Sequence, residues 1–132
     1  MDFSQFKTRQ EAVEWCKREK GMTGTEANAW LAKKVPLEKY YQGKIIEWIK
    51  KNAPQAFVWK ATQGAYSRKG IPDVCVVING RFYGFEIKRP FFGVISQMQT
   101  QTIKQIEKAG GKAYIVTYAK EVADILQEEL EK

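Results

Sequence analysis

Hydrophobic residues recur at helical spacing at both ends of the chain, and the first such stretch predicts two short helices within residues 1–34. Thr8 or Ser4 can cap the first helix, and Thr25 can cap the second. Hydroxyl side chains suit these places because they accept a hydrogen bond from the free backbone N–H groups of a first helical turn. The stretch is therefore expected to form a small helical unit.

A longer helix is predicted from Pro36 to about Lys51. Proline suits the first turn of a helix, where its missing N–H would have no partner. Apolar side chains recur every three or four residues and should form the inward face of this helix. They are Leu37, Tyr41, Ile45, Trp48 and Ile49.

The middle of the chain has the pattern of strands. Residues 56–61 and 81–88 are predicted strands, and residues 73–78 are apolar on both faces, which is typical of a strand inside a sheet. Asn79 and Gly80 separate the second strand from the third, and this dipeptide is a strong signal for a two-residue hairpin turn. The segment between the first two strands is predicted to be a polar loop.

The remaining segments complete an α/β pattern. A helix is expected over residues 96–108, a strand over 112–118, and a final helix with Val122 and Leu126 on its apolar face. A helix between two strands allows a parallel connection, whereas the hairpin is antiparallel. The fold class predicted is therefore α/β, with a mixed central sheet of about four strands flanked by helices.

The net charge of the chain indicates a polyanionic partner. The chain has 132 residues, enough for one domain with a short appendage, and its formal net charge is +7. A strongly basic balance favours nucleic acid as the partner. A basic surface that merely keeps the protein soluble would have the same composition.

Histidine is absent from the chain, and this absence narrows the chemistry. Serine or cysteine nucleophiles activated by histidine are excluded, as are zinc hydrolases with histidine ligands. Hydrolysis would have to rest on carboxylates, lysine and a hard metal ion. Cys16 and Cys75 are far apart and are expected to be reduced, buried thiols of a cytoplasmic protein from a bacterium or phage. No apolar run is long enough to span a bilayer, so no membrane association is expected.

The hairpin turn places two acids opposite each other. A two-residue loop pairs Ile78 with Arg81, and the same register places Asp73 directly opposite Glu86. Side chains alternate along a strand, so Lys88 should lie on the same face as Glu86. Two carboxylates and a lysine are thus expected to converge at the open end of the hairpin, provided that no bulge shifts the register.

This cluster has the chemistry of a magnesium site. Opposed carboxylates repel each other, and a shared Mg²⁺ would remove the repulsion, with the backbone carbonyl of Ile87 and water completing the ligands. Lys88 could stabilise charge on a phosphate or orient the attacking water. Asp73, Glu86 and Lys88 could instead form an edge salt bridge, and position alone favours neither interpretation.

The motifs around the acidic pair resemble those of PD-(D/E)xK nucleases. Residues 70–73 are Gly-Ile-Pro-Asp and residues 84–88 are Gly-Phe-Glu-Ile-Lys, similar to the GxPD and ExK motifs of that superfamily. Ser96 and Gln99 at the start of the next helix, and then Gly110, resemble the VRR-NUC branch more specifically. The resemblance implies a restriction-endonuclease-like core and metal-dependent cleavage of DNA, in some members at branched structures and in DNA repair.

Gln99 and Glu38 extend the predicted active site. Gln99 falls on the apolar line of its helix, where an amide needs a partner: a metal-bound water, a phosphate, a catalytic carboxylate or the local backbone. Glu38 lies in a first helical turn, where an acid also suits the helix dipole. In the family, an early glutamate a few residues before a glutamine completes the acidic cluster, and Glu38 with Gln42 fits that description better than Glu47. Glu38 is thereby a candidate metal ligand. The residues predicted to be catalytic are Asp73, Glu86, Lys88, Gln99 and Glu38.

Basic side chains accompany the acidic pair along the sequence. Residues 60–90 hold six Lys or Arg against two acids, a local charge of +4 that would help to neutralise a DNA backbone. Arg68, Lys69 and Arg89 are the best candidates for phosphate contacts, with Lys60 as a fourth. Tyr66 could stack on a base or pack under its own loop. Each basic residue, taken singly, could also be an ordinary solvated charge.

Residues 1–35 have no counterpart in the family core. They are predicted to be a helical N-terminal extension to a nuclease domain over residues 36–132. Phe91 and Phe92 follow Pro90 in a predicted loop, where they could make a dimer contact, act as a wedge in DNA or join the core. The short chain, this phenylalanine pair and the unassigned N-terminal helices favour a homodimer.

Together the residues and the family resemblance predict a Mg²⁺-dependent DNA endonuclease, with Mn²⁺ able to substitute, and the resemblance makes junctions or flaps candidate substrates. The alternative from another class is a basic DNA-binding module that does not cut, although such a module would gain nothing from carboxylates in its groove. An RNA-processing nuclease on the same core is a further alternative, because the residues do not separate DNA from RNA.

Overall fold

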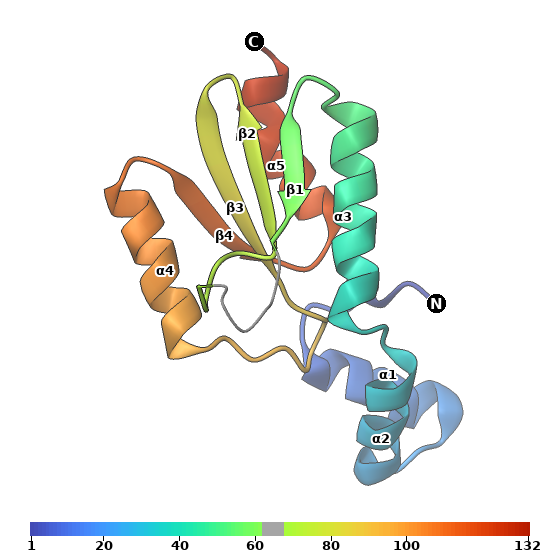
Figure 1. Cartoon of the computed structure of the whole chain (residues 1–132). Helices are drawn as coiled ribbons and strands as arrows, with labels where there is room; N and C mark the ends of the chain where they lie inside the picture. Colours follow the sequence, from blue (N-terminus) through green and yellow to red (C-terminus); the bar gives the residue numbers. More distant parts are fainter. Residues whose placement is uncertain (62–67) are drawn as a thin grey trace.

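A computed structural model describes residues 1–61 and 68–132 of the chain (Figure 1). Its helices and strands follow one another in the order that the sequence predicts, and each predicted segment agrees with the structure to within a few residues. In chain order the elements are a 3₁₀ turn η1 (Phe3–Gln5), α1 (Arg9–Lys20), α2 (Gly24–Lys34), α3 (Glu38–Asn52), β1 (Phe57–Lys60), β2 (Val74–Ile78), β3 (Arg81–Ile87), α4 (Gln97–Lys108), β4 (Lys112–Val116) and α5 (Ala119–Leu130).

The four strands form one mixed sheet in the order β1-β2-β3-β4. β1 with β2 and β2 with β3 are antiparallel, whereas β3 and β4, which are joined through α4, are parallel. This confirms the predicted fold class and the predicted place of β2 inside the sheet. The mixed topology also brings the last residues of β3 and β4 to the same edge.

The turn between β2 and β3 sets the register of the hairpin. Asn79 and Gly80 have φ values of 52° and 77°, the left-handed conformation that a two-residue hairpin turn of this kind requires. Ile78 therefore pairs with Arg81, and the register continues without a bulge along the ladder. The predicted pairing is confirmed as far as the ends of the strands.

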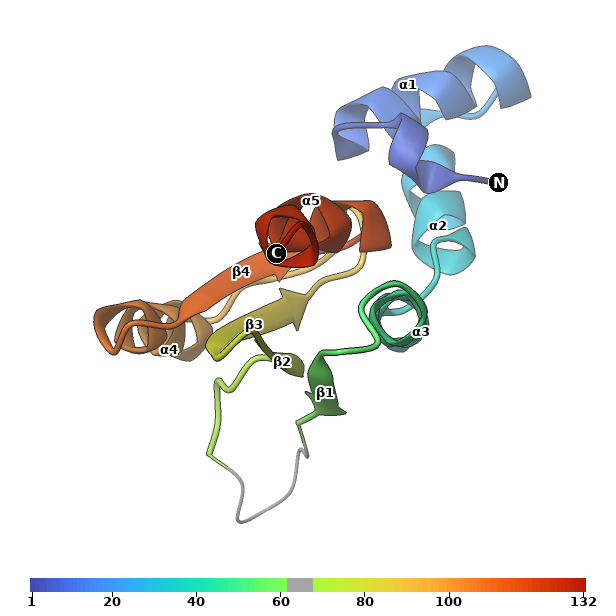
Figure 2. The ribbon, with the colours of Figure 1, turned by 90° about the horizontal axis from the view of Figure 1, so that it is seen from above.

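Helices cover the two faces of the sheet unequally. Seen from above (Figure 2), α3 and α5 lie together on one side, whereas α4 lies next to β4 and away from α3. The main core fills the space under α3 and α5, where Ile45 and Leu126 are fully buried with side chains from the inner strands. Burial of this apolar surface is the dominant stabilising term for the sheet.

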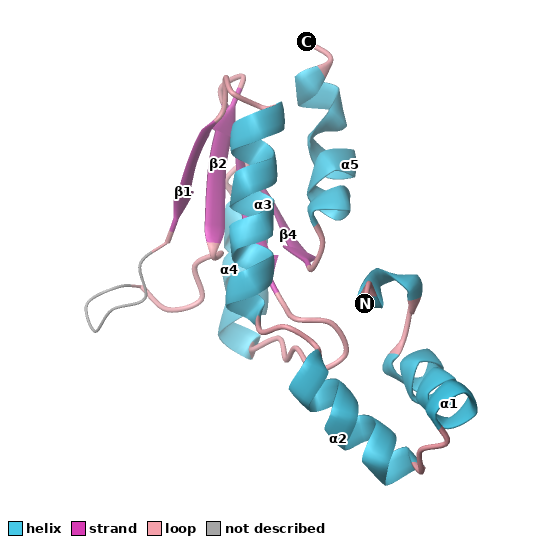
Figure 3. Ribbon diagram, turned by 90° about the vertical axis from the view of Figure 1, so that its right-hand side faces the viewer, coloured by secondary structure: helices cyan, strands magenta, loops and turns pink. Residues whose placement is uncertain are grey.

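The first two helices form a second, smaller core beyond the end of the sheet (Figure 3). Thr8 caps α1 by accepting a hydrogen bond from the Glu11 N–H, and Gly21 ends the helix in the left-handed conformation at φ 65°. Phe91 and Phe92 pack against this second core from the loop that follows β3. Of the predicted roles for the phenylalanine pair, core packing is the one that their burial supports.

Two details of the helices differ from the prediction. The cap of α2 is Thr23 rather than Thr25, because Thr23 and Glu26 satisfy each other's backbone N–H groups in a capping box, and two caps satisfied together outweigh a single hydroxyl. Leu37 does not belong to the inward face of α3. It lies outside the helix at the N-cap position and is 66% exposed.

Both cysteines are free and buried, as predicted. Burial raises the pKa of both thiols, that of Cys75 to about 11, so neither is a reactive thiolate near neutral pH. Within residues 1–61 and 68–132, no helix has the length and apolar character needed to cross a membrane.

Candidate active site

Asp73 and Glu86 lie opposite each other at the open end of the β2–β3 hairpin. Asp73 immediately precedes β2, and its Oδ2 accepts a hydrogen bond of 2.9 Å from the backbone N–H of Ile87. Glu86 lies near the end of β3 and is 3% exposed. The bond to Ile87 turns the Asp73 carboxylate toward the end of β3, so two acids from neighbouring strands share one small region.

Gln99 connects the start of α4 to this acidic pair. Its Nε2 donates a hydrogen bond of 2.7 Å to Oε1 of Glu86, while its Oε1 accepts a bond of 2.9 Å from the Ser96 N–H. The Ser96 hydroxyl completes the capping box by accepting a bond from the Gln99 N–H. Of the partners expected for this amide, the carboxylate and the local backbone are both present, and together they orient one oxygen of Glu86.

Lys88 lies on the same side of β3 as Glu86. Its Nζ is 3.7 Å from Oε1 of Glu86, and its backbone N–H donates to the Val116 carbonyl at the end of β4. The loop after β3 folds back over the aliphatic part of the Lys88 side chain. The approach is so close that a β-carbon added to Gly93 would lie 2.7 Å from Cβ of Lys88. Strand pairing on one side and this loop on the other restrict where the ammonium group can lie.

The second carboxylate oxygen of Glu86 is buried without a hydrogen-bond partner among the described residues. Burial, and then the negative charge of Asp73, raise the pKa of Glu86 to about 8, and Lys88 only partly offsets these two effects. A buried carboxylate with an open oxygen is costly unless a proton or a cation joins it. The carboxylate pair can therefore take up a proton or a cation.

Hard oxygen donors at this place suit Mg²⁺ better than they suit softer metals. Within residues 1–61 and 68–132, no three His, Cys, Asp or Glu side chains gather closely enough to hold a metal ion by themselves. Glu38, at the start of α3, is half-buried and near enough for its charge to raise the pKa of Glu86, but it does not complete such a group. A metal ion here would need the acidic pair, a backbone carbonyl and water.

Arg89 points away from the acidic pair and into the contact with the N-terminal helices. Its guanidinium donates to the backbone carbonyls of Ala32 at 3.0 Å and Val35 at 2.7 Å, at the end of α2, and it lies 4.9 Å from the centre of the Phe92 ring. Both hydrogen bonds come from Nη2, and Nε is buried without a partner among the described residues, so the guanidinium is turned into the protein. In the structure Arg89 thus joins the loop after β3 to the end of α2. The sequence had led us to expect a phosphate contact instead.

The other predicted basic residues remain at the surface. Arg68 bonds to Gln105 of α4 and, with Lys69, lines a shallow hollow of about 340 Å³ against that helix. Lys60 is exposed at the end of β1. Tyr66, the predicted stacking residue, lies outside the described residues.

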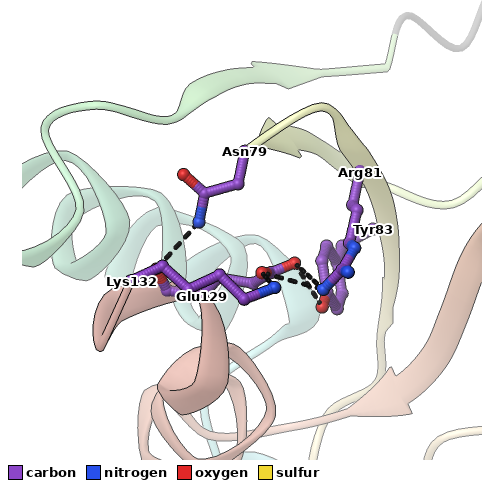
Figure 4. Close-up of polar contacts among 5 residues, drawn as sticks. All are labelled: Asn79, Arg81, Tyr83, Glu129 and Lys132. Atoms are coloured by element: carbon purple, nitrogen blue, oxygen red, sulfur yellow. Dashed lines mark hydrogen bonds and ion pairs between the residues drawn. The ribbon is translucent and has the colours of Figure 1, made fainter.

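A further cluster of polar residues, at the other end of the hairpin, was not predicted. Glu129 of α5 is fully buried, and its carboxylate accepts bonds from the Arg81 guanidinium at 3.2 Å and the Tyr83 hydroxyl at 3.0 Å (Figure 4). Lys132 is 2.8 Å from the same carboxylate, and Asn79 donates to the backbone carbonyl of Glu129. The available signal was an acid at helical spacing from Val122 and Leu126, on the apolar face of the last helix.

Comparisons with known proteins agree with the fold. No family model matches the chain, and no curated protein matches it. A solved structure described as a VRR_NUC domain is similar, with 24% sequence identity and a TM-score of 0.52 over 67% of this chain and 95% of that one. The chain therefore has a VRR-NUC-like fold, which confirms the resemblance at the level of the fold.

Proposed function

We propose that this protein is a Mg²⁺-dependent DNA endonuclease that hydrolyses phosphodiester bonds. The observation that carries the proposal is the state of Glu86. One of its oxygens is held by Gln99 at 2.7 Å, and the other is buried and open beside Asp73. A buried carboxylate oxygen without a hydrogen-bond partner does not help to hold the sheet together, whereas a metal ligand needs an oxygen with a free lone pair. The similarity of the fold to a VRR_NUC domain supports the same reading.

Each residue of the proposed site has a separate task. Asp73, Glu86 and the Ile87 carbonyl would hold Mg²⁺, with Glu38 acting through water. Bound Mg²⁺ supplies positive charge to the scissile phosphate and lowers the pKa of a water molecule. Gln99 keeps the Glu86 carboxylate in one orientation. Lys88, whose Nζ is 3.7 Å from Glu86, would donate to a phosphate oxygen or hold the attacking water.

Junctions and flaps are the proposed DNA substrates, and the active form is proposed to be a homodimer. A dimer would place two sites on the two strands of a junction. Phe91 and Phe92 do not support this proposal, because both pack within the chain against the second core. It rests on the small size of the protein. Light scattering that finds only monomer at micromolar concentration, with cleavage intact, would remove the dimer and keep the nuclease.

Cleavage assays test the main proposal. Linear, nicked, flap, four-way and supercoiled DNA should be cut with Mg²⁺ or Mn²⁺ and remain intact with excess EDTA. Asp73→Asn and Lys88→Ala should each abolish cleavage, whereas Glu47→Gln, an exposed acid on α3, should not. Undiminished cleavage in EDTA would refute the metal mechanism. Binding without cleavage of any substrate would favour the non-catalytic module, and cleavage of RNA alone would favour the RNA nuclease.

A further inference from the structure

Several large apolar side chains are exposed on the sheet, on the face opposite α3 and α5. Phe57 of β1 is 68% exposed and Trp59 is 38% exposed, although both are residues that proteins normally bury. The rings lie close together, with centroids 5.4 Å apart for Phe57 and Trp59 and 6.3 Å apart for Trp59 and Phe82. We call Phe57, Trp59, Val77 and Phe82 the aromatic patch. Contiguous exposed apolar surface of this kind marks a place where something binds.

The aromatic patch shares a face of the sheet with the acidic pair. Phe57 pairs with Val77, and Val77 pairs with Phe82, so these side chains form one row across three strands. Trp59 lies in the next row, and the row after that contains Asp73 and Glu86. Rows on one face are about 7 Å apart, which is twice the rise per residue of a strand. Counted along the strand direction, the patch therefore begins about 7 Å from the acidic pair and extends to about 14 Å from it.

No helix of the described chain covers this face of β1 and β2. The core under α3 and α5 includes Tyr83, Phe85 and Ile87, whose side chains point to the other face. α4 is on the same face as the patch, as the bond from Gln99 to Glu86 requires, but it lies next to β4 rather than over β1 (Figure 2). β1 is moreover an edge strand. Among residues 1–61 and 68–132, the patch thus stays exposed to a partner.

The charge around the aromatic patch indicates which partner. The cations whose contacts place them on this face are Lys88, beside Glu86, and Arg68 and Lys69, which lie against α4. The acids placed there by their contacts are Asp73 and Glu86, whose negative charge a bound Mg²⁺ would offset. Two copies meeting through this face would bring together two surfaces of like charge, which is unfavourable. A polyanion that binds this face would instead contact charges of the opposite sign.

We propose that the aromatic patch is a stacking platform for unpaired bases of single-stranded DNA beside the acidic pair. Aromatic side chains in a basic surface are the means by which proteins bind single strands, since every base has a face that can stack. Bases inside a duplex are already stacked on each other and do not reach a flat protein surface. The inference rests on the proposed function and refines it: the preferred substrate has a single-stranded stretch within a few nucleotides of the cut phosphate.

Binding measured without cleavage tests the platform. In EDTA, fluorescence anisotropy compares a labelled oligothymidylate with an abasic oligomer of equal length, which has the same phosphates and no bases. The wild-type protein should bind the oligothymidylate more tightly. Trp59→Ala and Phe57→Ala should each weaken that binding by about 5- to 150-fold and leave binding of the abasic oligomer unchanged.

Matched variants separate stacking from loss of fold. Trp59→Leu keeps an apolar side chain and should lose the preference for bases while melting close to the wild type. Tyr40→Ala removes an aromatic side chain that is 51% exposed on α3, away from the patch, and should keep the preference. Circular dichroism melts of all variants identify any that have unfolded, and Phe57→Ala, at the more exposed site, tests the proposal if Trp59→Ala is unstable.

Each outcome decides for or against the platform. An equal preference for bases in the wild type, Trp59→Leu and Phe57→Ala would overturn it. So would a fall from dimer to monomer in these variants with unchanged affinity, because the patch would then be a protein contact. If the wild type prefers bases through the patch but cuts no DNA with Mg²⁺, the platform stands and the proposed nuclease activity fails. If it cuts DNA without any preference for bases, only the platform fails.

Discussion

Glu86 has one oxygen bonded to Gln99 and another that is buried without a partner among the described residues. This arrangement explains both why the ionised Glu86 carboxylate lowers the stability of the fold and why it could bind a cation. An ionised carboxylate in such a place is destabilising, so in the absence of metal the folded protein holds a proton there more tightly than the unfolded chain does. A divalent cation would take the place of that proton.

The first prediction concerns the stability of the metal-free protein against pH. Glu86 has a folded-state pKa of about 8, above its ordinary value of 4.5, so its contribution to the free energy of unfolding is fully present below pH 4.5 and is lost as pH rises through 8. Glu86→Gln cannot ionise and should remove this loss. Asp73→Asn removes a neighbouring charge and should reduce it. Urea unfolding in EDTA between pH 5 and pH 8.5 measures the difference.

Glu47→Gln is the control for this experiment, because Glu47 is an exposed acid of α3 and should leave the pH profile as in the wild type. If the profile of Glu86→Gln also matched the wild type, Glu86 would not be the group that titrates. An edge salt bridge among Asp73, Glu86 and Lys88 would give another pattern. Removing either partner would then lower stability and leave cleavage unchanged.

The second prediction concerns Gln99, which touches Glu86 and would not touch the phosphate. Gln99→Leu should weaken metal affinity or cleavage by about 10- to 100-fold, as is usual for residues that orient a metal ligand. Raising the Mg²⁺ concentration should restore part of the activity. Gln97→Ala changes an exposed glutamine of the same helix and serves as the control. Metal titrations of cleavage for both variants give the answer, and equal titration curves would contradict the role assigned to Gln99.

Sequence reasoning located the acidic pair and missed the orientation of Arg89 for a physical reason. Asp73 and Glu86 are related by a local hairpin, and a turn of two residues fixes which positions face each other. The direction of the Arg89 side chain depends instead on the end of α2, whose carbonyls lie more than fifty residues away in the sequence. Neither periodicity nor spacing indicates that such a contact will form.

At the scale of elements, the strands and helices follow from local signals. Thr8 and Gly21 bound α1, and Asn79 with Gly80 sets the hairpin, because each residue type satisfies a local backbone need. The contact between α5 and the hairpin is of another kind. A glutamate on an apolar helix face shows that some partner must exist, but its identity depends on which strand lies beneath the helix.

The third prediction tests this contact through Glu129. The hydrogen bond from Lys132, and then those from its other partners, lower the pKa of Glu129 to about 2. A depressed pKa stabilises the fold above the ordinary value of 4.5, and this stabilisation is lost as pH falls from 4.5 to about 2. Glu129→Gln should cost about 1–3 kcal/mol near neutral pH and make acid unfolding less steep.

Glu128→Gln is a matched control for this prediction, since its neighbouring carboxylate is exposed. Chemical denaturation of both variants at pH 7 and pH 3 compares them with the wild type. The loss in Glu129→Gln should be largest at pH 7 and smaller at pH 3. A loss of equal size at the two pH values would mean that packing, rather than charge, holds α5 to the hairpin.

For the molecule as a whole, acids and bases are segregated along the chain. Residues 57–108, from β1 through α4, contain eight Lys or Arg and three acids, Asp73, Glu86 and Glu107, whereas α5 contains a group of acids. α5 lies on the opposite side of the sheet from the aromatic patch. The arrangement would leave one face of the molecule suited to a polyanion, and long-range attraction to that face would speed encounter with DNA.

The fourth prediction is a strong dependence of DNA binding on salt. If about five phosphates are neutralised, the logarithm of the binding constant should fall with the logarithm of salt concentration with a slope near −4.5. Arg68→Ala removes an exposed cation and should reduce that slope by about 1. Arg89→Ala removes a cation that is bonded within the protein and should lower stability while leaving the slope unchanged. Binding isotherms of both variants at several salt concentrations measure this slope. If Arg68→Ala and Arg89→Ala reduced the slope equally, Arg89 would also contact DNA.

The contact between Glu129 and the hairpin also bears on how the chain is made. Ribosomes release the chain from its N-terminus, and the β2–β3 hairpin needs only local residues to form. Asp73 and Glu86 can therefore be brought together while α5 is still inside the ribosome. The hairpin tip, with Arg81 and Tyr83, stays without its buried partner until residue 129 has emerged. Because an isolated two-stranded hairpin is only marginally stable in water, we expect the acidic pair to be held firmly in place only after the later strand and helices have packed on the hairpin.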